Sequence, residues 1–214
     1  TLYAGWILDA YTIVYHLDGG VNHTDNPNNY TKETETITFE IPAKDGYTFD
    51  GWYEKEDFSG VQITQITKGS EGNKSIYAKW SLVTFSITYY LNEGASTGTN
   101  PAAYTAETET ITLASPVRIG YSFGGWFDNI GLTGTAISTI PKGSFGNKHL
   151  YARWLLNYTI TYILDDGVNN SSNPAFYTEE TDIITLGSPT KAEYRFAGWY
   201  GNLSYTEPSI TIIP

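Results

Sequence analysis

Apolar and polar residues alternate at the start of three stretches of this chain. In the first stretch Tyr11, Ile13 and Tyr15 fall on one side of an extended strand, with polar or smaller residues between them. Side chains of a strand point to opposite faces in turn, so this alternation predicts a half-buried β-strand. The pattern returns at 85–91 and 158–164, which predicts the same strand three times.

Shorter motifs recur with these strands and give the chain a fixed period. An Asn-Pro pair and a Gly-Trp pair follow each predicted strand, and Asn26 returns 74 residues later as Asn100 and 73 residues after that as Asn173. A period of this size predicts an array of small domains. The predicted division is a closing strand of a preceding unit plus linker at 1–10, repeat 1 at 11–80, repeat 2 at 81–154, and repeat 3 at 155–214 without its closing strand.

Each repeat is predicted to consist of short strands. In the first repeat apolar alternation continues around Thr34–Ile41, at Tyr47–Tyr53 and at Ser75–Trp80, and turns rich in Gly, Asn and Asp separate these segments. The segment 54–67 is compatible with a short strand or with one helical turn. The linkers between repeats are short, so we expect a mostly β chain that forms an extended, semi-rigid rod.

Composition and charge narrow the class of protein. Aromatic residues make up 15% of the chain and charged residues 16%, which favours an all-β extracellular module. The chain has no Cys, so it has neither a disulfide framework nor a thiolate metal site. Its net charge of −11 argues against nucleic acid or anionic lipid as a partner. No apolar run approaches the ~20 residues of a membrane-spanning helix, so we expect no membrane insertion in this segment.

The titratable residues do not form a recurring site. His16 and His23 lie near acidic residues in the first repeat, but the second repeat has Tyr90 and Thr97 at the matching positions. Paired carboxylates such as Glu33 and Glu35 do recur, yet small domains of this size leave little room for the cleft that glycoside hydrolysis needs. We therefore predict no enzyme activity, no metal site and no cofactor.

The tryptophans are the strongest candidates for structural residues. Trp52, Trp126 and Trp199 follow Gly in each repeat, and a buried Trp is the natural anchor of a small core. The alternative is that these side chains are exposed and bind a ligand, since aromatic residues dominate binding hot spots. We predict packing at the joints between repeats for the Trp residues that close a repeat. These are Trp80 and Trp154, and Trp6 is their counterpart at the start of the chain.

One family carries the same series of motifs. The residues Gly46–Tyr53 followed by Ile76–Trp80 resemble the Listeria–Bacteroides repeat, also called the internalin B-repeat. They recur at Gly120–Phe127 with Leu150–Trp154, and the third repeat keeps Tyr194–Tyr200 with Glu193 in place of the leading Gly. The resemblance covers essentially the whole chain. It implies a small β-grasp (ubiquitin- or SUMO-like) domain in tandem, in secreted or wall-attached bacterial proteins, with no catalytic activity.

The resemblance and the repeats together predict a role at the bacterial cell surface. We expect a stalk, a spacer or an adhesin whose partners are neighbouring repeats or other copies of the protein. The first alternative is a module in which exposed aromatic or polar side chains of each repeat bind a host glycan or protein. A solvent-facing aromatic stripe in every repeat would favour that alternative, whereas buried Tyr and Trp would favour a structural array.

The second alternative is a subunit that polymerises through its ends. The segment Thr1–Trp6 matches the closing strand at His149–Trp154, and the third repeat stops before its own closing strand. An open sheet edge accepts an added strand. The ends are explained by fragmentation at an exposed loop, by a longer continuous array of which this is one stretch, or by strand exchange between molecules. In each case we predict that this first segment pairs with a third repeat. The residues proposed for this exchange are Leu2, Tyr3, Ala4, Trp6, Ile210 and Ile212.

Overall fold

The computed structural model describes residues 1–213, and all regular secondary structure among them is β-strand. This confirms the mostly β class predicted from the sequence. The helix that a β-grasp domain implies is absent from the described residues. The strands are β1 (Tyr11–His16), β2 (Asn29–Tyr30), β3 (Ile37–Thr38), β4 (Tyr47–Tyr53), β5 (Gln65–Ile66), β6 (Lys74–Leu82), β7 (Phe85–Tyr90), β8 (Ala103–Tyr104), β9 (Ile111–Thr112), β10 (Tyr121–Phe127), β11 (Thr139–Ile140), β12 (Lys148–Leu156), β13 (Tyr158–Thr159), β14 (Phe176–Tyr177), β15 (Ile184–Thr185) and β16 (Ile212–Ile213).

The chain folds into two compact units. One consists of Thr1–Thr88, Pro101–Thr112 and Thr139–Lys148, and the other consists of Tyr89–Asn100, Leu113–Ser138 and the chain from His149 onward. The first sequence repeat lies wholly in one unit and the third wholly in the other, whereas the second repeat contributes to both.

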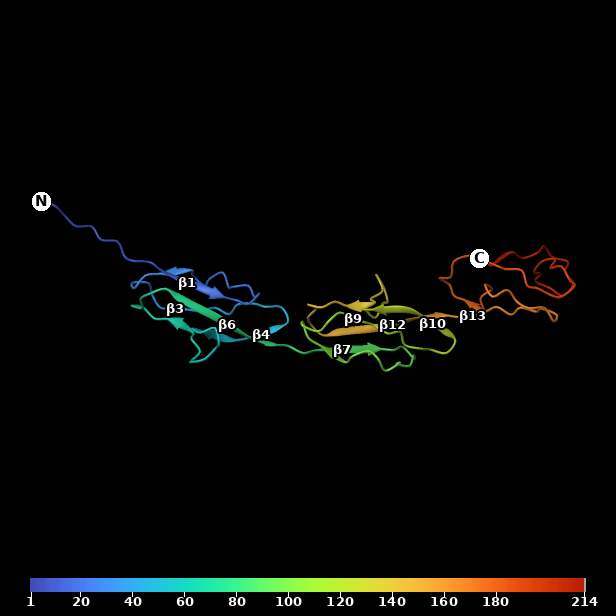
Figure 1. The fold of residues 1–214 in the computed structure, drawn as a ribbon, viewed down its shortest axis with the longest axis horizontal. Coiled ribbons are helices and arrows are strands. Elements are labelled where there is room, and N and C mark those ends of the chain that lie inside the picture. Colours follow the sequence, from blue (N-terminus) through green and yellow to red (C-terminus); the bar gives the residue numbers. More distant parts are fainter. Residues whose placement is uncertain (214) are drawn as a thin grey trace. The chain divides into compact units, whose positions relative to one another are not determined.

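The first repeat is built on a four-stranded sheet with the order β2-β1-β6-β4 (Figure 1). The two central strands, β1 and β6, are parallel, with Tyr15 opposite Ile76, and both outer strands are antiparallel to their neighbours. The first and last strands of the repeat therefore meet at the centre of the sheet. A small second sheet pairs β3 with β5, so the undecided segment 54–67 ends in a short strand.

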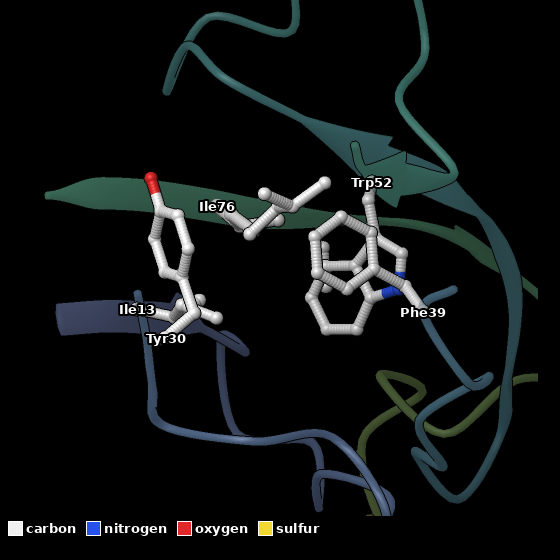
Figure 2. Close-up of a cluster of buried hydrophobic side chains, with 7 residues drawn as sticks. Ile13, Tyr30, Phe39, Trp52 and Ile76 are labelled. Carbon is white, nitrogen blue, oxygen red and sulfur yellow. The ribbon is translucent and has the colours of Figure 1, made fainter. Parts of the chain in front are cut away.

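Alternation along β1 places the core of the first repeat on one face of this sheet. Ile13 is buried, while Thr12 and Val14 are exposed, as the sequence pattern predicted. Figure 2 shows the cluster that results, with Ile13 and Tyr30 near one end and the rings of Phe39 and Trp52 near the other. Ile76 of β6 lies between them and is fully buried, which makes the closing strand part of the core.

The second repeat has the equivalent sheet, with the order β10-β12-β7-β8, and a small sheet of β9 and β11. In both repeats the antiparallel pairing with the closing strand shifts register just before the recurring tryptophan, between Phe49 and Gly51 and between Phe123 and Gly125. Gly51 has a φ of 133° and Gly125 has a φ of 113°, a region that favours glycine. The recurring Gly-Trp pair is therefore a β-bulge that sets the direction of the indole.

The third repeat lacks the strand pairing at the centre of the other two. The segment 194–200 matches β4 and β10 in sequence but forms only isolated bridges, and 160–163 is not a strand. Both segments would pair with a closing strand, and no described segment occupies that place in the third repeat. Burial falls accordingly, since Ile13 and Ile87 are buried but the matching Ile160 is half-buried.

The turn before this segment keeps its geometry despite the sequence change. Gly46 and Gly120 have φ values of 82° and 79°, and Glu193 at the matching position has a φ of 63°. The residue that replaces glycine therefore adopts the same left-handed conformation, which is costly for a side chain with a Cβ atom.

Candidate functional site

The recurring tryptophans of the first two repeats are buried. Trp52 and Trp126 are 2% and 1% exposed, and each indole Nε1 donates a hydrogen bond to a backbone carbonyl of its own repeat, Glu40 O at 3.3 Å and Ala114 O at 3.2 Å. Trp199 makes the same bond to Gly187 O at 3.2 Å but is only half-buried. In the first two repeats these indoles are therefore not accessible to a ligand.

The tryptophans that close a repeat are used inside that repeat. Trp80 Nε1 donates to Leu17 O at 3.0 Å, and its ring lies 5.4 Å from the ring of Phe49. Trp154 Nε1 donates to Leu91 O at 2.8 Å in the same way. Each indole therefore closes the end of its own sheet. Packing of these side chains at the joints between repeats stays a prediction.

A groove opens in the third repeat where the closing strand lies in the other two. Its volume is about 590 Å³, and its lining includes Tyr162, Leu164, Gly167, Phe196 and Trp199. Phe196 is 36% exposed as a result. The charged residues Asp165, Lys191 and Arg195 line the groove together with these apolar side chains.

Aromatic side chains stack in one pair on the outer face of the sheet in each of the first two repeats. We call these two pairs the outer aromatic row. The His16 ring stacks on Tyr77 with centroids 4.2 Å apart and planes 6° apart. Tyr90 stacks on Tyr151 with centroids 4.4 Å apart and the same angle. The third repeat has Ile163 at the position of His16 and Tyr90. This row is a candidate binding surface because its rings face away from the core.

The recurring carboxylates are paired with lysines in their own repeat. Lys68 Nζ lies 2.5 Å from Glu35 Oε1, and Lys142 Nζ lies 2.5 Å from Glu109 Oε1. The hydrogen bond that the Lys142 ammonium donates to Glu109 raises the pKa of Lys142. Glu35 and Glu109 are largely exposed, and each faces the lysine of its own repeat.

Two of the histidines lie beside a polar side chain. His23 Nδ1 lies 3.8 Å from Asp25 Oδ2, and His149 Nδ1 lies 3.4 Å from the Tyr90 hydroxyl. Among residues 1–213 no three His, Cys, Asp or Glu side chains are grouped so as to hold a metal ion. That described range also has no helix that could cross a membrane.

Two half-buried tyrosines have raised pKa values. Burial raises the pKa of Tyr15 to about 12, and its hydroxyl donates to Pro27 O at 3.0 Å. Burial also raises the pKa of Tyr162, which donates to Pro174 O at 3.0 Å. Both hydroxyls hold the loop with the recurring Asn-Pro pair, which is a structural role.

The residues predicted for strand exchange lie in two different settings. Leu2, Tyr3 and Trp6 are 100%, 91% and 90% exposed, and residues 1–10 form no strand. Ile210 instead bridges Trp199, and Ile212 pairs with Thr185 of β15. Ile210 and Ile212 therefore each have a partner within the third repeat, and the pairing of residues 1–6 with a third repeat stays a prediction.

Sequence reasoning did not identify the outer aromatic row. The alternation in β1 already places His16 on the face opposite Ile13, and Tyr77 alternates with the buried Ile76 and Ala78. This alternation along each strand was the only sign in the sequence that the two side chains lie on the outer face. Their stacking depends on the parallel register of β1 and β6, which places His16 opposite Tyr77 and cannot be read from one strand.

Comparison with known proteins agrees with this repeated architecture. The model of the Listeria-Bacteroides repeat domain matches residues 11–79, 85–153 and 158–211. The chain belongs to this family. The matches fall on the three sequence repeats, and the third match ends before the place where a closing strand would begin. No solved structure matches the chain.

The curated relatives are longer proteins. Two proteins of Evansella cellulosilytica, provisionally named as membrane proteins and one of them as Gly-rich, are each 30% identical to this chain over 97% of its length. The chain spans 30% of the length of the first and 23% of the second. Internalin H of Listeria monocytogenes is 29% identical over 88 residues, which cover 38% of this chain and 14% of that protein.

Proposed function

We propose that this chain is a non-enzymatic repeat array of a bacterial cell-surface protein and that it acts as a stalk or spacer. The proposal rests on the contacts of the side chains that recur. In each repeat the recurring Trp, Asn and Tyr side chains form hydrogen bonds or ring contacts within that repeat. A chemistry shared by the array would instead leave a recurring set of polar groups free at one place.

The recurring asparagine shows this most clearly. Asn26 accepts a hydrogen bond from Glu40 N at 2.8 Å and donates to Glu40 O at 3.0 Å. Asn100 forms the same pair of bonds with Ala114, and Asn173 forms it with Gly187. Each asparagine side chain bonds to the N–H and C=O of one residue, as the backbone of a neighbouring strand would. It therefore fixes the loop before the recurring Trp and has a structural role.

The names of the relatives support placement at the cell surface. Two are provisionally named as membrane proteins and one as an internalin. We propose that the array lies outside the cell, attached to the membrane or the wall by other parts of its protein. We further propose a β-grasp-like unit, because the first and last strands of the first repeat are parallel neighbours at the centre of the sheet.

A stalk also requires an extended array. The linkers are tied to the repeat that precedes them, since Val83 N donates to Gly46 O at 3.0 Å and Asn157 N donates to Gly120 O at 3.0 Å. Such ties limit the freedom of the linker backbone. We therefore propose a semi-rigid rod.

Small-angle scattering tests this proposal. A compact protein of this length has a radius of gyration of about 17 Å, and we expect a clearly larger value. A control chain with a flexible Gly-Ser insertion between residues 156 and 157 should give a broader distribution of sizes. A radius of gyration near that of a compact protein would contradict the stalk. A second assay measures turnover of bacterial or host glycans. Turnover that is lost in Glu109→Gln would contradict the proposal that the array is not an enzyme.

The outer aromatic row supports a second candidate function, which is binding of a glycan or host protein. Exposed, pre-stacked rings present apolar area at low entropic cost, as residues of binding hot spots do. In a titration with cell-wall or host glycans, Tyr77→Ala and Tyr151→Ala should weaken binding, whereas Thr12→Ala on the same face should not. Binding that is unaffected by both tyrosine substitutions would exclude this face.

A further inference from the structure

Gly46 of the first repeat lies against a residue of the second. It has a φ of 82° and is buried, and a Cβ atom at this position would lie 2.5 Å from the Cβ atom of Ala106. Carbon atoms in good contact are about 3.5–4.0 Å apart, so no larger residue fits here. Gly46 O also accepts a hydrogen bond from Val83 N of the linker at 3.0 Å. All three residues belong to the same compact unit.

A polar contact lies next to this packing. The Tyr47 hydroxyl donates a hydrogen bond to Glu107 Oε1 at 2.7 Å, and this bond raises the pKa of Tyr47. The ring of Tyr47 is itself held by its own repeat, because Lys44 Nζ lies 4.2 Å from the ring centroid and 3.0 Å from Asp18 Oδ2. Two consecutive residues of the first repeat therefore contact two consecutive residues of the second.

The turn that carries the second pair of residues is fixed by hydrogen bonds. Thr105 N donates to Thr108 Oγ1 at 2.9 Å, and Thr108 N donates to Thr105 O at 3.1 Å. Ala106 O accepts a hydrogen bond from Gly143 N at 2.9 Å. We call Thr105–Thr108 the docking turn. Groups that are already held in place lose little conformational freedom when they form a contact.

The matching turn of the third repeat makes a different contact. Gly120 matches Gly46 and has a φ of 79°, but it is exposed, and a Cβ atom there would have no neighbour within 4 Å. The third repeat has Glu179 in place of the alanine of the docking turn, and its Glu180 forms an ion pair with Arg153 of β12. Close packing therefore occurs where the turn has alanine, and an ion pair takes its place where the turn has glutamate.

We propose that the docking turn packs against Gly46 and Tyr47 and fixes the orientation of the second repeat relative to the first. The partner of this surface is thus the following repeat of the same chain, and the surface selects a turn with a small residue followed by glutamate. This inference rests on the proposed semi-rigid array and assigns the contact that holds its first joint. Salt screens an ion pair between exposed groups but not apolar packing, so the two joints differ in their response to salt.

Pairs of spin labels test this in the full chain, which has no Cys of its own. Thr12→Cys and Ser86→Cys place labels at matching exposed positions of the first two repeats. We expect a narrow distance distribution that stays the same at about 1 M salt, where the screening length is about 3 Å. Labels at Ser86→Cys and Thr159→Cys span the second joint, and their distribution should broaden at that salt concentration.

Substitutions separate the docking contact from backbone strain. Gly46→Ala should broaden the first distribution, because the added methyl group overlaps the Cβ atom of Ala106. Gly120→Ala is the matched control, since it introduces the same left-handed strain without a neighbour to meet, and it should leave the first distribution unchanged. Ala106→Glu should broaden the distribution with no change at the glycine. Glu107→Gln should lower the pKa of Tyr47, which NMR of the labelled tyrosine measures.

Four results would overturn the proposal. The first is a broad distribution between the first two repeats in the unmodified chain, and the second is a distribution that neither Gly46→Ala nor Ala106→Glu changes. The third is equal broadening by Gly46→Ala and Gly120→Ala, which would mean that strain is the cause. The fourth is a pKa of Tyr47 that Glu107→Gln does not change.

The radius of gyration distinguishes this failure from failure of the stalk. A broad distance distribution together with a large radius of gyration would remove the docking contact and leave an extended array with a free joint. A radius of gyration near that of a compact protein would contradict the stalk itself.

Discussion

Replacing Trp126 by Ala should lower the free energy of unfolding of the second repeat by about 3–5 kcal/mol, the range seen for large aromatic side chains in cores. Trp126 is 1% exposed, and its ring lies 5.2 Å from Tyr89 and 5.4 Å from Phe123. Burial of about 150–250 Å² at about 25 cal/mol per Å² gives about 4–6 kcal/mol as an upper bound. The substitution also leaves Ala114 O without its indole donor.

Trp199→Ala is the matched control. Trp199 forms the same indole bond and the same two ring contacts, with Tyr162 at 5.2 Å and Phe196 at 5.3 Å, but it is half-buried beside the open groove. With about half of the apolar area removed from water, the expected cost is about 2 kcal/mol.

Urea unfolding followed by residue-resolved NMR measures both substitutions in the repeat that carries them. Each repeat should lose stability without a comparable loss in the others, because stability in an array is nearly a sum of unit and joint terms. A cost below about 1 kcal/mol for Trp126→Ala would mean that the indole is not a core anchor. Equal costs for the two substitutions would mean that the groove does not affect the third repeat.

Three further predictions concern polar and strained positions. Asn26→Ala should cost about 1–3 kcal/mol in chemical denaturation, because both Glu40 backbone groups lose their partner; no measurable loss would refute the role of the asparagine. Glu193→Gly should raise the stability of the third repeat by about 1 kcal/mol in the same assay by relieving a left-handed conformation, and a loss would contradict this. Stability should fall as pH rises from about 10 to about 12, because the raised folded-state pKa of Tyr15 keeps its proton on while the unfolded chain releases it. Tyr15→Phe should weaken this dependence, and an unchanged pH profile would exclude Tyr15 as its source.

The fold was predictable where one strand carries its own pattern. The alternation in Tyr11–His16 and the turn before Tyr47–Tyr53 gave the positions of β1 and β4 closely. The segment around Thr34–Ile41 has equally good alternation but contributes only Ile37–Thr38 as a strand. The difference lies in the partner, because this segment pairs only with the two residues of β5. Pairing between distant segments cannot be read from local periodicity.

The candidate sites were predictable to a similar extent. The matching sequences located the closing strand at the last segment of each of the first two repeats, and the segment ending at Trp6 resembles it. The place of this strand within the sheet was not predictable from its position along the chain. In the structure the closing strand of the first repeat instead lies between β1 and β4, which are far from it in the chain. The sheet order, and not the order along the chain, determines which edge is left open.

The third repeat shows that a sequence typical of a strand is not sufficient for that segment to form a strand. Tyr194–Tyr200 keeps the aromatic and Gly-Trp positions of β4, and Trp199 keeps its bond to the loop carbonyl, yet the segment is not a strand. What differs among the described residues is the closing strand, which lies at the centre of the sheet in the first two repeats and has no described counterpart in the third. In the first two repeats the last segment therefore completes the sheet.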